Sequence, residues 1–144
     1  MNRAILDTDI FSEVLKGRNL AVASSAKNYL AAFGRFTLSA ITVMEIVQGL
    51  SKKRQAASIP RFTELADASE ILSFDRPAAE YAGRVYADLE RSGQPIGRAD
   101  PMIAGIAMHH GLVLVTANVN HFRRITDLGY PLELENWRDE TPSS

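Results

Sequence analysis

The feature that most constrains the fold is a short apolar run near the N-terminus that ends in three polar residues. Residues 4–6 lead directly into Asp7-Thr8-Asp9, and an amphipathic pattern follows as far as Gly17. An apolar run that is closed by polar residues and followed by a helical pattern is typical of a buried parallel strand that feeds a helix. In open α/β sheets, ligands bind outside the carboxyl ends of such strands. We therefore expect Asp7 at the floor of a binding site.

The rest of the chain repeats this alternation of apolar runs and amphipathic stretches. Strands that alternate with helices predict a single α/β domain, whose mostly parallel central sheet has four or five strands and carries helices on both faces. A length of 144 residues corresponds to one domain, which we expect to cover residues 1–140, with residues 141–144 as a disordered tail. The predicted strands after the first are residues 36–41, 70–74, 112–116 and 132–134. The predicted helices include residues 20–33, 42–50, 61–68, 77–92 and 100–110, and residues 117–122 are predicted to be a loop or short turn.

Composition excludes several classes of protein. The sequence has no cysteine, which rules out disulfides and thiolate metal sites and is compatible with a reducing cytosol. No apolar run approaches the ~20 residues of a membrane span, and the N-terminus lacks the pattern of a signal peptide. We therefore expect a cytoplasmic protein with no membrane partner. The net charge of -1 offers no generally basic surface, so any nucleic acid must be bound through local patches.

Acidic and amide side chains follow several of the predicted strands. Asp7 and Asp9 follow the first strand, Glu45 lies one turn into the helix after the second, and Asp100 begins a helix after a glycine-containing loop. Asn118 follows the clearest strand of the chain. Because the carboxyl ends of parallel strands share one edge of a sheet, a single crevice can gather all of these side chains.

Each of these residues also has a purely structural explanation. Asp100 before Pro101 is a good helix N-cap, Asp9 can cap the first helix, and Glu45 fits a capping box with Thr42. Caps are scattered over a surface, however, whereas these junctions share one edge. Carboxylates within ~4–6 Å of one another repel, and Mg²⁺ relieves that repulsion while keeping water sites open for a phosphate. Bound ions also activate water and stabilise an in-line phosphoryl displacement.

No other catalytic arrangement competes with this acidic set. The sequence contains no Cys nucleophile, no Ser–His arrangement and no phosphate-binding loop. His109 and His110 are adjacent and are expected to face apart on a helix, so neither they nor His121 form a metal-ligand pattern.

The segments that carry the acidic residues resemble the PIN-domain ribonucleases, and within them the VapC-type toxins of bacterial toxin–antitoxin pairs. The matching segments lie in the same order as in that family and span nearly the whole chain. They are residues 5–10, residues 38–45 with Gly49, residues 93–100 with Ile103-Ala104, residues 114–118 with Phe122, and residues 134–137.

The resemblance implies roles for individual residues. Asp7 and Asp100 match the main Mg²⁺ carboxylates, and Glu45 matches a third acid that completes the metal site directly or through water. Asn118 falls where many relatives carry a fourth acid, and it counts as a catalytic candidate with the other three. Asp9 is a further candidate ligand.

Neighbours of these acids also have matches in the family. Thr8 and Thr116 match positions that support the acidic cluster. His121 falls where relatives often have an acid, so it supplies no replacement carboxylate. Arg98 is either a solvated loop arginine or a contact to the scissile phosphate.

Partners follow from the same resemblance. It implies a homodimer that is neutralised by a cognate VapB-type antitoxin in a hetero-oligomer, with DNA bound only indirectly through the antitoxin. The tract from Thr42 to Ala68 offers either an apolar groove for a partner helix or ordinary core packing. The groove candidates are Ile46, Val47, Leu50, Ile59, Phe62 and Leu65, and Lys52, Lys53, Arg54 and Arg61 are either an RNA-backbone track or a solvated face.

Together with the acidic set, the resemblance implies an Mg²⁺-dependent endoribonuclease, with Mn²⁺ as an alternative ion, that acts as the toxin of a type II toxin–antitoxin system on RNA such as tRNA. One alternative is a non-catalytic PIN-like module that binds RNA or protein. Another is a phosphatase of the haloacid dehalogenase class, which uses an Asp-x-Asp pair after its first strand. Phe11 stands where that class carries Thr or Val.

Overall fold

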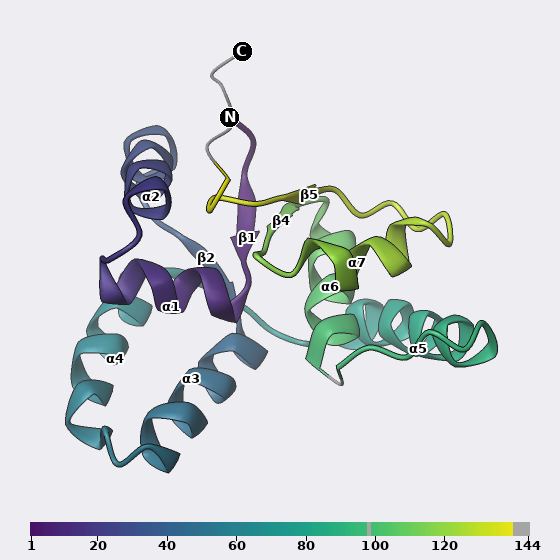
Figure 1. Ribbon diagram of the computed structural model, residues 1–144, viewed down its shortest axis with the longest axis horizontal. Coiled ribbons are helices and arrows are strands. Elements are labelled where there is room, and N and C mark those ends of the chain that lie inside the picture. The colour runs from purple at the N-terminus through teal and green to yellow at the C-terminus, as the bar shows by residue number, and fades with distance from the viewer. Residues whose placement is uncertain (98, 140–144) are drawn as a thin grey trace.

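The computed structural model describes residues 1–97 and 99–139, and the expected tail at residues 141–144 lies outside this part (Figure 1). The described part alternates strands and helices in chain order, as the sequence predicts. The elements are β1 (Ala4–Leu6), α1 (Thr8–Lys16), α2 (Leu20–Phe33), β2 (Thr37–Ser39), α3 (Ala40–Lys52), a 3-10 turn (Ala56–Ser58), α4 (Ile59–Asp67), β3 (Glu70–Leu72), α5 (Arg76–Arg91), α6 (Ala99–His110), β4 (Val113–Val115), α7 (Val119–Thr126) and β5 (Leu134–Glu135).

All strand pairs are parallel, but they form two sheets instead of one. The larger sheet has the order β1-β4-β5, and β2 pairs only with β3. β1 and β2 lie next to one another, and the Thr8 hydroxyl just after β1 is hydrogen-bonded to the Thr42 hydroxyl just after β2 at 3.0 Å. The carboxyl ends of β1, β2 and β4 therefore still meet in one region. The expected four or five parallel strands are present, and the division into two ladders is the difference from the sequence prediction.

Helices cover both faces of the larger sheet. Helices α1–α4 lie on one side of β1 and α5–α7 on the other (Figure 1). Successive strand residues point to opposite faces, so Leu6 packs into the first hydrophobic core, with Phe11 and Tyr29, whereas Ile5 packs into the second, with Ile103. This two-sided burial explains why the strands are continuous apolar runs.

Helices α5 and α6 are packed very closely in the second core. A Cβ atom at Gly105 would lie 2.4 Å from the backbone oxygen of Ala78, a distance that no real side chain tolerates. The small residues Ala104 and Ala107 beside it are fully buried. This contact fixes α6, and with it the position of Asp100 in the first turn of that helix.

Three local predictions were wrong. Residues 117–122 were expected to be a loop or short turn, but the helix α7 begins at Val119, because Phe122 and Ile125 lie one turn apart and are both buried. The last strand was expected at residues 132–134, but it lies at Leu134–Glu135, where it pairs with β4. Asp9 was considered as the cap of the first helix, but Asp7 caps α1 and Asp9 lies in its first turn. Within the described residues, no helix is both long and apolar enough to cross a membrane.

Candidate active site

Asp7 is the most enclosed of the predicted site residues. It is only 6% exposed, and its carboxylate caps α1 by accepting a hydrogen bond from the backbone N–H of Thr8 at 2.8 Å. The parallel register places Leu6 opposite Val115, so the next residues, Asp7 and Thr116, also lie side by side. The Thr116 hydroxyl donates to Asp7 Oδ2 at 2.8 Å. Both carboxylate oxygens are therefore held in place before any ligand binds.

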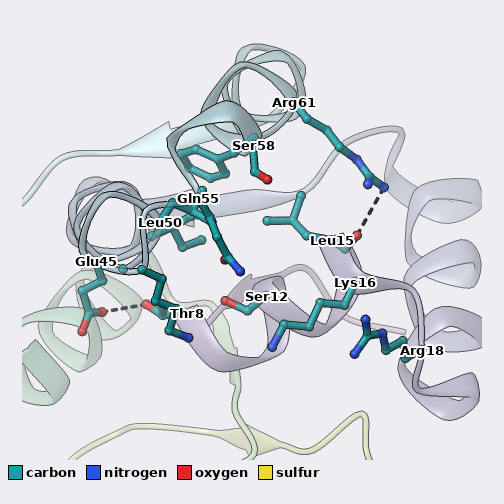
Figure 2. Close-up of a pocket in the computed structure, with 14 residues that line it drawn as sticks. Thr8, Ser12, Leu15, Lys16, Arg18, Glu45, Leu50, Gln55, Ser58 and Arg61 are labelled. Carbon is teal, nitrogen blue, oxygen red and sulfur yellow. Dashed lines mark hydrogen bonds between the residues drawn. The ribbon is translucent and has the colours of Figure 1, made fainter.

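Glu45 contacts Thr8 instead of the N-terminus of its own helix (Figure 2). Helix α3 begins at Ala40 and is capped by Ser39, whose hydroxyl accepts from the backbone N–H of Thr42 at 2.9 Å. The expected capping box of Thr42 and Glu45 is therefore wrong. Glu45 Oε1 accepts a hydrogen bond from the Thr8 hydroxyl at 2.6 Å, which joins α3 to the turn after β1.

Asp100 reaches the same region from the first turn of α6. Its Oδ2 lies 3.6 Å from Nδ1 of His121, and the Asn118 side-chain nitrogen lies 2.8 Å from the same Nδ1. The backbone N–H of Asn118 donates to the Thr116 hydroxyl at 3.0 Å. Asn118 is therefore connected to Asp7 through Thr116 and to Asp100 through His121.

Burial and neighbouring charges raise the pKa of Asp7. Burial has the largest effect and the charge of Asp9 follows, and the net pKa is raised from 3.8 to about 7. The hydrogen bonds from Thr116 and Thr8 lower it in part, and Asp100 adds a smaller increase. A carboxyl in this setting ionises fully at neutral pH only when a positive charge compensates it.

The pKa of Asp100 is raised as well. Burial is again the main cause, His121 acts in the opposite direction, and the charges of Glu45 and Asp9 add to the increase. Burial also raises the pKa of Asp9, although backbone hydrogen bonds and the charge of Arg138 lower it. The four carboxyl groups thus affect one another electrostatically, as expected for groups gathered in one crevice.

The donor set of Asp7, Glu45, Asp100 and Asp9 suits a hard divalent cation. All its ligand atoms are carboxylate oxygens, which Mg²⁺ and Mn²⁺ prefer. Within the described residues, no three ligand atoms of this acidic cluster all lie within 4.8 Å of one another. Mg²⁺ keeps several of its water ligands, so the carboxylates need not supply its whole coordination shell.

A groove extends from the acidic cluster between α1, α3 and α4 (Figure 2). Its volume is about 380 Å³, and Thr8 and Glu45 line the end at the cluster. Its apolar lining comes from Leu15, Ile46, Leu50 and Phe62, and its cationic lining comes from Lys16, Arg18, Lys53 and Arg61.

The groove agrees only in part with the residues expected from sequence. Of the six apolar candidates, Ile46, Leu50 and Phe62 line it, and of the four basic candidates, Lys53 and Arg61 do. The remaining apolar and cationic lining residues, Leu15, Lys16 and Arg18, come from α1 and the turn after it, whose proximity to α3 no local pattern indicates.

Two neighbours of the acidic residues, His121 and Arg98, were also singled out in the sequence. His121 was expected only to supply no replacement carboxylate, and its contacts with Asp100 and Asn118 were not foreseen. Its position three residues after Asn118 is a signal only once α7 is known to be a helix. Arg98 lies outside the described residues.

Comparison with known proteins agrees with this architecture. The family model "PIN domain" matches residues 4–128. A tRNA(fMet)-specific endonuclease VapC from Shigella flexneri is 33% identical over 95% of this chain and 99% of its own length, and Ribonuclease VapC2 from Haemophilus influenzae is 31% identical over 95% and 99%. The crystal structure of DNA-bound VapBC from Salmonella typhimurium superposes with a TM-score of 0.81 at 30% identity, and the match covers 95% of this chain and 99% of that one. The chain therefore belongs to the PIN domain family.

Proposed function

We propose that this protein is a divalent-metal-dependent endoribonuclease and the toxin of a type II toxin–antitoxin pair, acting on RNA in the cytoplasm. The observation that supports it most is the gathering of Asp7, Glu45, Asp100 and Asp9, whose charges affect one another, at the meeting point of three parallel strands. Relatives named as VapC ribonucleases match nearly the whole chain, which supports the same reading.

In this proposal Asp7, Asp100 and Glu45 hold the ion, which is Mg²⁺ or Mn²⁺. A bound ion of this kind lowers the pKa of a coordinated water and stabilises charge on a phosphodiester. Thr8 donates to Glu45, and Thr116 donates to Asp7, so each hydroxyl fixes the orientation of one carboxylate. These hydrogen bonds also favour the ionised carboxylates, the form that a metal requires.

Asn118 completes the catalytic set in a supporting role. Its side-chain amide lies against His121, and His121 in turn lies against Asp100. A neutral amide brings no further charge to a crevice that already holds four carboxyl groups. The proposal therefore assigns Asn118 to the positioning of His121 and Asp100, and the metal to the three acids.

The groove beside Glu45 is where we place the partners. Its apolar lining suits an amphipathic segment of a VapB-type antitoxin, and Lys16, Arg18, Lys53 and Arg61 suit the phosphates of RNA. An antitoxin segment in this groove would cover the acidic cluster from the Glu45 side and exclude RNA. Homodimerisation, and DNA contact only through the antitoxin, are parts of the same proposal.

The test is cleavage of a mixed tRNA pool by the purified, antitoxin-free protein. We expect discrete fragments with Mg²⁺, none with a chelator and none with Asp100→Asn. Asp67→Asn, which changes an exposed carboxylate at the end of α4, is the matched control and should cleave at the rate of the unmodified protein. Cleavage that persists in both the chelator and Asp100→Asn would refute the proposal.

The same assay separates the two alternatives. A non-catalytic binding module would retain RNA without cutting it under any metal condition. A phosphatase would release phosphate from a phosphomonoester and leave internal RNA bonds intact. The match of residues 4–128 to the PIN domain model gives the phosphatase alternative no support.

A further inference from the structure

The second candidate metal-binding group lies far from the acidic cluster, where α5 begins and α6 ends. Asp75, His109 and His110 each offer one ligand atom, and these three atoms all lie within 4.8 Å of one another. In the part of the chain that the structure describes, this is the one group of three or more His, Cys, Asp or Glu residues with such spacing. The two histidines were expected to face apart, and that prediction was wrong.

The end of the helix explains how two adjacent histidines come together. His109 and His110 are the last two residues of α6, their ring centroids are 4.6 Å apart, and both side chains are exposed. Because α6 ends at His110, this helix has no later turn that could hold the two rings apart. Both rings are therefore free to turn toward the start of α5.

Asp75 is held in position from the other side. One of its carboxylate oxygens, Oδ1, caps α5 by accepting from the backbone N–H of Ala78 at 3.2 Å. The other oxygen, Oδ2, lies 3.6 Å from Nε2 of His109. The cap thus orients the carboxylate and leaves one oxygen available to a ligand.

The spacing matches that of a small tetrahedral ion. Zn²⁺ with bonds of about 2.1 Å separates neighbouring ligand atoms by about 3.4 Å. The 3.6 Å between Asp75 Oδ2 and His109 Nε2 is already close to this separation. The other ligand-atom pairs lie within 4.8 Å, so each needs to approach by no more than about 1.5 Å, a movement within reach of exposed side chains. The end of α6 also favours a cation, because its last carbonyl groups carry partial negative charge.

We infer that Asp75, His109 and His110 form a binding site for a transition-metal ion of the zinc class, with water completing the coordination. Two imidazoles and one carboxylate favour Zn²⁺, Ni²⁺ or Cu²⁺ over Mg²⁺, so this site and the all-oxygen cluster select different ions. Asp100 and His109 are nine positions apart in α6, which is about 14 Å along the axis, so the two sites are distinct. A bound ion joins the start of α5 to the end of α6 and stabilises the folded chain.

The test is a calorimetric titration of ZnCl₂ into the untagged full-length protein in excess MgCl₂. We expect one Zn²⁺ site in the unmodified protein and in Asp7→Asn, which disables the acidic cluster. His109→Ala and His110→Ala should each weaken it by at least about tenfold, because even the loss of a ligand's outer hydrogen bond costs that much. Zn²⁺ should also raise the unfolding temperature of the unmodified protein. It should not raise that of the variant that combines His109→Ala with His110→Ala.

Two results would overturn the inference. One is Zn²⁺ binding that the histidine variants leave unchanged, and the other is Zn²⁺ binding that Asp7→Asn abolishes. Because both histidines are exposed, their replacement should leave the unfolding temperature in chelator unchanged, and that measurement verifies that the variants fold. Neither readout uses RNA cleavage, so the inference stands or fails independently of the proposed function.

Discussion

Replacing Asp7 by Asn should stabilise the metal-free protein at neutral pH while it removes cleavage. The folded-state pKa of Asp7 is about 7 and its ordinary value is 3.8. At position 7 the folded protein therefore binds more protons than the unfolded chain between these values, so the contribution of Asp7 to stability is greatest below pH 4 and falls as the pH rises to about 7. At about 1.4 kcal/mol per pKa unit, the ionised Asp7 carboxylate costs the folded state about 4 kcal/mol above pH 7.

An asparagine at position 7 avoids this cost but loses one hydrogen bond. Its side-chain oxygen still accepts from Thr8 N–H, whereas its NH₂ group cannot accept the hydrogen bond that the Thr116 hydroxyl donates to Asp7. That loss costs about 1 kcal/mol, which leaves a net gain of about 3 kcal/mol at pH 7.5. For a chain of this length the unfolding temperature should rise by roughly 10 °C.

The assay is thermal and urea unfolding in EDTA at pH 4 and pH 7.5, repeated with Mg²⁺. We expect the gain of Asp7→Asn at pH 7.5 to disappear at pH 4, and Mg²⁺ to stabilise the unmodified protein more than the variant. The exposed control Asp67→Asn should change stability by less than about 0.5 kcal/mol. If Asp7→Asn were less stable than the unmodified protein in EDTA at pH 7.5, or if its gain were equal at both pH values, the electrostatic reasoning would be refuted.

Three further predictions concern neighbouring features. Asn118→Asp should tighten Mg²⁺ binding in a calorimetric titration, because it adds a carboxylate beside the acidic cluster. Unchanged or weaker binding would show that the side chain at position 118 does not lie close to the bound metal. Thr116→Val should raise the pKa of Asp7 further by removing the hydrogen bond to its Oδ2, so the pH–rate profile of cleavage should move to higher pH, and an unmoved profile would contradict this. Gly105→Ala should destabilise the protein by about 2 kcal/mol in urea unfolding, because the added Cβ would meet a backbone oxygen. The control Gly83→Ala in α5, whose Cβ would meet no atom within 4 Å, should be neutral or stabilising. Equal effects of the two substitutions would refute the packing argument.

Local pattern was enough to predict most elements of the fold. The helix at 20–33 has the predicted bounds, because Asn19 caps its start and Gly34, in the left-handed region, ends it. The strand at 113–115 follows from its uninterrupted apolar run. Helix α7 was missed because it is only eight residues long and just two of its residues, Phe122 and Ile125, are buried.

Side-chain partners were much harder to predict than the elements that carry them. The sequence suggested that Glu45 caps its own helix, and only the proximity of α3 to the turn after β1 shows that it accepts from Thr8. Likewise, nothing near His121 in sequence indicates Asp100, which belongs to another helix. These contacts depend on how elements pack, and hydrophobic periodicity carries no information about packing partners.

The sequence by itself determined the α/β alternation, the apolar strands and the acidic residues that follow them, because each depends on neighbours within a few positions. Only the tertiary structure decided that the strands form two ladders, that Lys16 and Arg18 share a groove with Glu45, and that Asp75 meets His109 and His110. The physical reason is that these features join segments far apart in the chain, and their geometry is set by the register of the strands and by the close packing of α5 on α6.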